Sequence, residues 1–347
     1  MTPVGVAVVG AGYWGPNLVR NFSASDGADL RWVCDLDEQR ARRAVGRYST
    51  IGVTTSLERV LDDPTVRAVA LATPAATHAE VGLAALEAGK HLLVEKPLAA
   101  TFEDGRKLVE VAAARDLVLM CDHTYCYTPS VRRIRELVGG GALGEVQYVD
   151  SVRINLGLIQ PDIDVVWDLA PHDLSILDAV LPADRRPLAV AAHGADPVGA
   201  GRACVAYLTL PLAGGGVAHV HVNWLSPTKI RTTILGGSRQ MVVWDDLEPA
   251  ARLRIFDRGV DLAASAGAEA RARNLVSYRI GEMVAPALDE REALGGVVAE
   301  FLAAIRERRP PLTDGRSGLR VLEVLEAASA SMAAGGALVP LTGGREG

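Results

Sequence analysis

The chain has 347 residues, of which 49% are hydrophobic, and its net charge is −6 at neutral pH. This length exceeds what one hydrophobic core usually serves, so two domains are expected. The acidic balance argues against a nucleic-acid partner, and no apolar run approaches the ~20 residues of a membrane span. The N-terminus enters an apolar strand without a signal segment, which predicts a cytoplasmic protein.

A glycine-rich turn follows the first apolar run, Val4 to Val9. The residues Gly10-Ala11-Gly12-Tyr13-Trp14-Gly15 match G-x-G-x-x-G and precede a segment with helical spacing. Glycines in such a strand–turn–helix unit allow a tight turn and let backbone N–H groups approach a dinucleotide pyrophosphate. The sequence therefore predicts a dinucleotide site, the alternative being an ordinary turn in another strand–helix unit.

An acidic residue ends the next apolar run, Leu30 to Cys34. Asp35 lies twenty residues past Gly15, where a carboxylate can accept hydrogen bonds from the adenosine ribose. NAD is therefore favoured over NADP as the cofactor. The alternative is that Asp35 only caps a loop.

Apolar runs continue to alternate with helical patterns up to residue 124. The runs at 66–72, 91–94 and 117–121 are typical of buried parallel strands, and the segments 75–88 and 102–115 have helical spacing. This alternation predicts a doubly wound parallel sheet, a Rossmann domain over residues 1–124.

Lys96 follows the predicted strand at 91–94, within Val94-Glu95-Lys96-Pro97. Ligands of open α/β sheets bind beyond the carboxyl ends of the strands. The chain has only four lysines against 32 arginines, and arginine does not deprotonate, so Lys96 is a candidate titratable amine. The alternative is a solvated lysine beside a turn proline, and Pro97 raises the question of a cis bond.

The pattern changes to strand after strand beyond residue 124. A helix at 130–138 leads to β-type segments at 146–155, 204–210, 217–224, 230–235 and 240–244, and helical periodicity returns at 287–308 and 318–333. Such clustering predicts an open, mostly antiparallel sheet. The expected fold is α/β: a Rossmann domain, then an α+β domain at 125–316 for substrate binding and oligomerisation. A C-terminal helix at 317–347 is expected to pack back on the Rossmann domain.

The segment Trp167 to Asp173 is the next candidate site. If a helix starts here, Asp168 and His172 lie one turn apart on the same face, and Pro171 fits only the first turn. Histidine titrates near neutrality and can exchange a hydroxyl proton. Alternatively, Asp168 is an N-cap and His172 an ordinary packed or exposed helix residue.

No metal site is predicted. Cys121, His123 and Cys126 lack the paired cysteine spacing of zinc sites. His219 and His221 alternate on one face of a strand, which is more typical of a polar sheet face than of a metal centre.

Four motifs, in order along the chain, carry a resemblance to the glucose-fructose oxidoreductase / inositol dehydrogenase / MocA family. They are Gly10 to Gly15, Glu95-Lys96-Pro97, Asp168 through His172, and Pro311 to Gly315. The resemblance implies that Lys96, Asp168 and His172 are catalytic. It also implies a second domain whose open sheet carries the substrate on one face, and a homodimer or homotetramer formed through that sheet.

Within this family the chain is most similar to nucleotide-sugar 3-dehydrogenases and 3-ketoreductases. The similarity rests on Gly12 to Leu18, His123 to Tyr125 with Pro129, Arg153 to Gly157, and Trp167 to Asp173. Asp122 departs from the pattern, since relatives commonly place glycine before the histidine.

The resemblance also assigns contacts to residues outside the catalytic set. The implied substrate contacts are Lys96, Arg153, Asn155, Asp168 and His172. The implied cofactor contacts are Gly10, Gly12, Tyr13, Trp14, Gly15, Asp35, Thr73, Pro74, His78, Glu95 and Lys96.

The expected reaction is reversible hydride transfer between nicotinamide C4 and a secondary alcohol or ketone carbon of a sugar. The leading candidate for that carbon is C3 of a nucleotide-linked sugar. His172 would take the hydroxyl proton, Lys96 would bond the reacting oxygen, and Asp168 would orient the sugar or the histidine, although Lys96 and His172 can exchange roles. The alternatives are an inositol or free-sugar dehydrogenase, an NAD-retaining isomerase or lyase, and an NAD-binding sensor.

Overall fold

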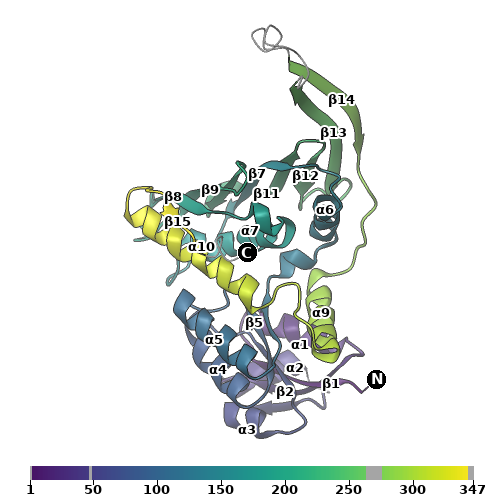
Figure 1. Cartoon of the computed structure of the whole chain (residues 1–347). Helices are drawn as coiled ribbons and strands as arrows, with labels where there is room; N and C mark the ends of the chain where they lie inside the picture. The colour runs from purple at the N-terminus through teal and green to yellow at the C-terminus, as the bar shows by residue number, and fades with distance from the viewer. Residues whose placement is uncertain (1, 47–48, 263–275, 343–347) are drawn as a thin grey trace. The chain divides into compact units, whose positions relative to one another are not determined.

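The computed structural model describes residues 2–46, 49–262 and 276–342 (Figure 1). The chain divides into two compact units. Unit 1 takes in residues 1–128, 174–179 and 290–326, and unit 2 takes in residues 129–173, 180–289 and 327–347. The functional domain boundaries at residues 124 and 316 stay a prediction. Residues 263–275 of the predicted domain at 125–316 lie outside the described part of the chain. So do residues 343–347 of the predicted C-terminal helix at 317–347.

Unit 1 contains the predicted parallel sheet, with strand order β3-β2-β1-β4-β5-β6. Each strand pairs in parallel with its neighbours. Its strands are β1 (Val4–Val9), β2 (Ala28–Cys34), β3 (Gly52–Thr54), β4 (Ala68–Leu71), β5 (His91–Glu95) and β6 (Leu119–Asp122). Its helices are α1 (Gly15–Ser23), α2 (Glu38–Val45), α3 (Leu57–Asp62), α4 (His78–Glu87), α5 (Phe102–Ala114) and α9 (Ala293–Glu307), with 3-10 turns at Ala75–Thr77 and Thr124–Tyr127.

Buried apolar strands and capped helices explain this arrangement. Every residue of β1 is buried, as expected for a central parallel strand covered on both faces. Phe22 of α1 and Phe301 of α9 are fully buried in the core that contains β1, and burying each ring stabilises the fold by about 1.5–3 kcal/mol. Asp37 and Thr101 cap α2 and α5 by accepting hydrogen bonds from backbone N–H groups.

Unit 2 contains the predicted second sheet, with strand order β14-β13-β12-β11-β7-β10-β9-β8-β15. Its pairings are antiparallel except between β7 and β10, so the sheet is mixed but mostly antiparallel. The strands are β7 (Val146–Leu156), β8 (Ala189–Ala195), β9 (Val205–Pro211), β10 (Val217–Asn223), β11 (Leu225–Gly237), β12 (Met241–Asp245), β13 (Leu253–Leu262), β14 (Val276–Val284) and β15 (Val339–Pro340). Helix α6 (Pro129–Gly139) and a 3-10 turn at Ala183–Arg185 also belong to this unit, and β13 and β14 form a long hairpin (Figure 1).

The burial pattern of this sheet alternates, unlike that of β1. Along β10, Ala218, Val220 and Val222 are buried, while Val217 and His219 are exposed. One face is therefore packed and the other faces outward, which is the usual state of an antiparallel sheet. The α/β fold predicted from the sequence is confirmed.

Helix α7 (Val165–Val180) and helix α10 (Gly315–Ala333) are each divided between the two units.

One predicted helix of unit 1 starts later than expected. Helix α9 begins at Ala293 rather than near residue 287. The backbone of Glu292 is extended, so the helix begins at the next residue. The Glu292 carboxylate accepts hydrogen bonds from Arg20 of α1, at 2.7 and 2.6 Å.

Candidate active site

The glycine turn has the geometry that a dinucleotide requires. Gly10 has a φ of +94°, and a Cβ there would lie 2.6 Å from the carbonyl carbon of Ala72. A Cβ on Gly15 would lie 2.1 Å from the backbone oxygen of Gly10, whereas a Cβ on Gly12 would meet no atom within 4 Å. The first and third glycines are thus needed for packing, and the second leaves open space where a phosphate can approach.

Asp35 lies against this turn. Its Oδ2 accepts a hydrogen bond of 2.7 Å from the backbone N–H of Ala11, and its Oδ1 accepts one of 2.8 Å from Asp37. Each carboxylate oxygen can accept a further bond. A cavity of about 610 Å³ adjoins the turn and is lined by Ala11, Gly12, Tyr13, Pro16, Arg40, Arg43 and Ala44. These residues fit the pyrophosphate and adenosine ribose of NAD.

The predicted nicotinamide-side loop lies after β4. The His78 ring is 1% exposed, and its Nδ1 and Nε2 each lie 2.9 Å from a backbone oxygen, of Pro97 and of Thr73, so a neutral ring can donate to one of the two. Burial lowers the pKa of His78. Pro74 precedes the 3-10 turn, and Thr77 Oγ1 donates to Thr73 Oγ1. His78 therefore fixes the loop next to Pro97, and direct contact of Thr73, Pro74 or His78 with the cofactor stays a prediction.

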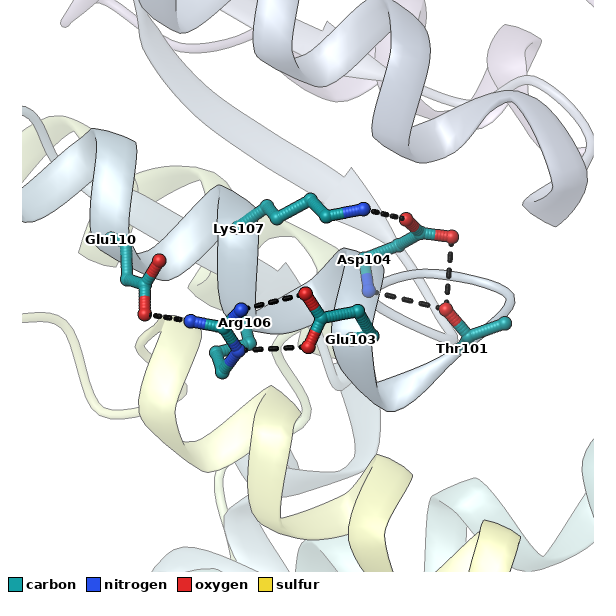
Figure 2. A network of polar contacts seen from close by, with 6 residues as sticks. All are labelled: Thr101, Glu103, Asp104, Arg106, Lys107 and Glu110. Carbon is teal, nitrogen blue, oxygen red and sulfur yellow. Dashed lines mark hydrogen bonds and ion pairs between the residues drawn. The ribbon is translucent and has the colours of Figure 1, made fainter.

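Lys96 immediately follows β5, and its bond to Pro97 is cis. Two other lysines have structural partners. Lys90 Nζ donates to the backbone oxygens of Asp63 and Val66, at 3.0 and 2.8 Å. Lys107 pairs with Asp104 in an exposed network on α5 (Figure 2). Lys96 itself follows the carboxyl end of β5, the edge of a parallel sheet where ligands bind.

Two acidic residues lie beside Lys96 in the same unit. Glu95 pairs with Asp122 across β5 and β6. Asp122 also accepts a 3.2 Å hydrogen bond from Trp14 Nε1, which links it to the glycine turn. Tyr13, by contrast, is 96% exposed. The sequence analysis noted Asp122 as a departure but did not predict this pair.

The expected start of α7 is wrong. The helix begins at Val165, because the Asp164 carboxylate accepts hydrogen bonds from the N–H groups of Val166 and Trp167, at 2.9 and 3.0 Å. Pro171 therefore lies inside the helix, where its missing N–H leaves the Trp167 carbonyl without its usual helical bond. Asp164, not Asp168, is the capping residue, so the side chain of Asp168 is available for another role.

Asp168 is held by a tryptophan from the sheet of unit 2. Trp224 Nε1 donates a 3.0 Å hydrogen bond to Asp168 Oδ2. A Cβ on Gly157 would lie 2.9 Å from Asn155 Nδ2 and 3.0 Å from Trp224 Cδ1, so all three residues are close neighbours. Unit 2 thus brings together two predicted site residues, Asn155 and Asp168. Trp224 is a functional candidate that no sequence motif indicated.

Arg153 is buried rather than open. It is 4% exposed, and its Nε and Nη2 donate to the carboxylate of Asp173 at 2.8 and 3.1 Å. Ser151 donates to the same carboxylate at 2.8 Å and bonds Thr233 at 3.2 Å. This network holds α7 against β7 at Asp173, the residue that follows His172. A direct contact of Arg153 with substrate stays a prediction.

The predicted site residues belong to different units. Unit 1 holds the glycine turn, Asp35 and Lys96, while unit 2 holds Asp168 and His172. Within the described ranges, no three side chains of metal-ligating type come together. No helix in the described part of the chain is long and apolar enough to cross a membrane.

Known proteins resemble both the N-terminal domain and the whole chain. Residues 4–123 match the GFO_IDH_MocA model, an oxidoreductase family with an NAD-binding Rossmann fold. UDP-N-acetylglucosamine 3-dehydrogenase of Acidithiobacillus ferrooxidans is 29% identical over 330 residues, 91% of this chain and 93% of that protein. Inositol 2-dehydrogenase 2 of Saccharopolyspora erythraea is 32% identical over 176 residues, 49% of this chain and 52% of that protein.

Solved structures extend the likeness to three dimensions. The structure of the Acidithiobacillus ferrooxidans UDP-N-acetylglucosamine 3-dehydrogenase has a TM-score of 0.80 at 26% identity, covering 96% of this chain and 99% of that one. The structure of GenD2 from gentamicin A biosynthesis, in complex with NAD, has a TM-score of 0.80 at 28% identity, covering 99% and 97%.

Proposed function

We propose that the chain, whose residues 4–123 match the GFO_IDH_MocA oxidoreductase family, transfers hydride between NAD and C3 of a nucleotide-linked sugar. The coarser activity follows from the comparisons: the chain is an NAD-binding oxidoreductase acting on CH–OH groups. The finer substrate is supported by a relative named for UDP-N-acetylglucosamine that matches nearly the whole chain. A cytoplasmic location stays a prediction.

The proposed chemistry separates hydride from proton. The nicotinamide of NAD, when bound, accepts the hydride, so the side chains have to handle the proton. As the C–H bond gives up its electron pair with the hydride, the O–H proton passes to His172 and a C=O bond forms. Lys96 donates a hydrogen bond to the reacting oxygen and stabilises its negative charge. If Lys96 and His172 exchange these two roles, the hydride and the proton still leave the same carbon and oxygen.

The observation that carries this assignment is the hydrogen bond from Trp224 to Asp168. It orients a carboxylate one helical turn before His172, and Asn155 lies near the same tryptophan. A carboxylate and an amide can together accept from and donate to sugar hydroxyls. We assign Arg153 to holding Asp173 and thereby the position of His172, because its guanidinium is buried.

The first test is NADH formation with NAD and a panel of UDP-linked sugars, free sugars and inositols. Lys96→Ala and His172→Ala should each lower kcat/KM by about 10²- to 10⁴-fold. Lys107→Ala is the matched control, since Lys107 belongs to an exposed network (Figure 2). Different pH–rate profiles for the two active-site variants would separate base from oxyanion donor, and identical profiles would contradict the assigned roles.

Other outcomes of this assay would replace the proposal. Turnover with inositols or free sugars alone would change the substrate class. Tightly held NAD that is never released as NADH would indicate an isomerase, a lyase or a sensor.

The glycine turn gives a test of the cofactor site that does not depend on the substrate. Gly12→Ala should fold normally and weaken NAD binding, because its methyl group enters the open space for a phosphate. Gly15→Ala should instead destabilise the protein, because its methyl group meets the Gly10 backbone at 2.1 Å. Equal NAD affinity in Gly12→Ala and the parent protein would contradict the proposed pyrophosphate position.

We further propose that the chain forms a homodimer or homotetramer through the outward face of the unit 2 sheet. Tyr207 and Val217 on this face are 54% and 38% exposed. Light scattering during size-exclusion chromatography measures the mass directly, and a monomer at every concentration would contradict this proposal.

A further inference from the structure

Two acidic side chains lie next to each other at the carboxyl ends of β5 and β6. Glu95 and Asp122 are direct partners in the parallel pairing of β5 and β6, so their side chains lie on the same face of the sheet. Asp122 is 1% exposed. Oε2 of Glu95 is buried and has no hydrogen-bond partner among the described residues. Unlike an ordinary buried ion pair, this arrangement brings like charges together.

The contact requires a proton on one of the two groups. Two ionised carboxylates side by side and shielded from water repel each other, so one of the two keeps its proton. Asp122 accepts from Trp14 Nε1 at 3.2 Å and from Thr124 Oγ1 at 2.7 Å, which stabilises negative charge on Asp122. Glu95 keeps a buried oxygen without a donor, so Glu95 is the protonated partner.

The surroundings agree with this assignment. Burial, followed by the charge of Asp122, raises the pKa of Glu95 well above its usual value, and Lys96 opposes the shift. Burial also raises the pKa of Asp122, against the hydrogen bonds from Thr124 and Trp14.

The neighbouring titratable groups on β6 and after it stay neutral. Burial, followed by the charges of Glu95 and Asp122, raises the pKa of the Cys121 thiol. Burial lowers the pKa of His123 to about 4. Lys96 is therefore the cation whose charge acts on the pair.

We propose that the Glu95–Asp122 pair holds one proton in the cofactor-free protein and releases it to water when NAD⁺ binds. The link to the cofactor is structural, because Trp14 belongs to the glycine turn and donates to Asp122. The second mononucleotide-binding half of the doubly wound sheet, formed here by β4 to β6, would hold the nicotinamide. This inference rests on NAD binding and not on the identity of the sugar.

The charge of the ring explains the direction of the proton movement. A positive nicotinamide held near the carboxyl ends of β5 and β6 would favour two carboxylates, so the Glu95 carboxyl would lose its proton. The reduced ring is neutral and leaves the proton in place. Oxidised cofactor should therefore bind more tightly as the pH rises, by up to about tenfold per pH unit, while the affinity for NADH stays constant.

Calorimetric titration in buffers of different ionisation enthalpy counts the protons. We expect release of about one proton per NAD⁺ near neutral pH and none with NADH. Glu95→Gln should abolish the release, and Glu103→Gln, in the exposed network of Figure 2, should leave it unchanged. Asp122→Asn serves as a second variant if Glu95→Gln does not fold.

The outcomes are distinct. NAD⁺ binding without proton release in the parent protein would overturn the inference and leave the cofactor assignment intact. Proton release that persists in Glu95→Gln would also overturn it. Absence of any binding heat would contradict the cofactor site itself. In the cofactor-free protein, the infrared carbonyl band of a protonated carboxyl group should be present and should disappear in Glu95→Gln.

Discussion

The two units bury charge in opposite ways. In unit 2, Arg153 and Asp173 have opposite charges, and Ser151 adds a third hydrogen bond to the same carboxylate. In unit 1, Glu95 and Asp122 are both acidic, and a proton on one of them keeps two like charges from meeting. The first pair fixes a helix in one state, while the second can exist in two protonation states. Buried ionisable groups thus hold a helix in place in unit 2, and in unit 1 they can change their protonation state.

Breaking the paired charges of unit 2 should have the largest effect. Asp173→Ala leaves the Arg153 guanidinium buried without its carboxylate, which should lower the free energy of unfolding by about 3–5 kcal/mol. Urea unfolding followed by two spectroscopic probes measures this loss. Glu38→Ala is the control, because its ion pair with Arg42 is exposed and should contribute less than ~1 kcal/mol. A similar small loss for Asp173→Ala would remove the distinction between the units.

Acid should act on unit 1 through His123. Burial lowers its pKa from 6.5 to about 4, so the folded state keeps the ring neutral while the unfolded chain takes up a proton. Stability is therefore lost as the pH falls from about 6.5 to about 4, by an amount on the order of 3 kcal/mol. His123→Gln should unfold with a smaller pH dependence over this range. Parallel pH curves for the variant and the parent protein would contradict the buried neutral state.

Much of the fold was predictable because its signals are local. The strand β1, the turn from Gly10 to Gly15 and the position of Lys96 follow from short runs of residue types. Strand β8 was missed because its alanines and glycine have low β propensity, and β3 was missed because three residues show no period. The start of α7 was misplaced because Pro171 was expected only in a first turn, and the cap at Asp164 was not recognised.

The candidate site was predictable residue by residue but not as a set of contacts. Glu95 and Asp122 lie on separate strands, and Trp224 reaches Asp168 from a strand far along the chain. Sequence spacing carries no information on such lateral neighbours. The catalytic roles of Lys96, Asp168 and His172 stay predictions that the variants above test.

Two tryptophans sharpen the comparison, because each donates its indole N–H to an acidic residue in its own unit. Trp224→Phe removes the 3.0 Å bond to Asp168 and should cost about 1.5–3 kcal/mol, the usual range for a hydrogen bond to a charged group. Trp14→Phe removes the 3.2 Å bond to Asp122, which keeps Thr124 and the shared proton, so a loss near ~1 kcal/mol is expected. Thermal unfolding of both variants measures the difference, and a larger loss for Trp14→Phe would argue against a proton shared by Glu95 and Asp122.

The smallest effect is expected on the outward face of the unit 2 sheet, around the exposed residues Tyr207 and Val217. Tyr207 and His221 stack there with ring centroids 4.3 Å apart and planes 15° from parallel. Tyr207→Leu should lower the free energy of unfolding by about 0.5–1.5 kcal/mol, the usual value of an aromatic pair.

Unfolding measured at several protein concentrations shows whether this face is covered by another copy. If it is, the midpoint depends on concentration and the variant weakens assembly, because binding of a second copy adds to the stability of the folded state. A midpoint independent of concentration, with the same small loss throughout, would contradict the proposed subunit contact at this face.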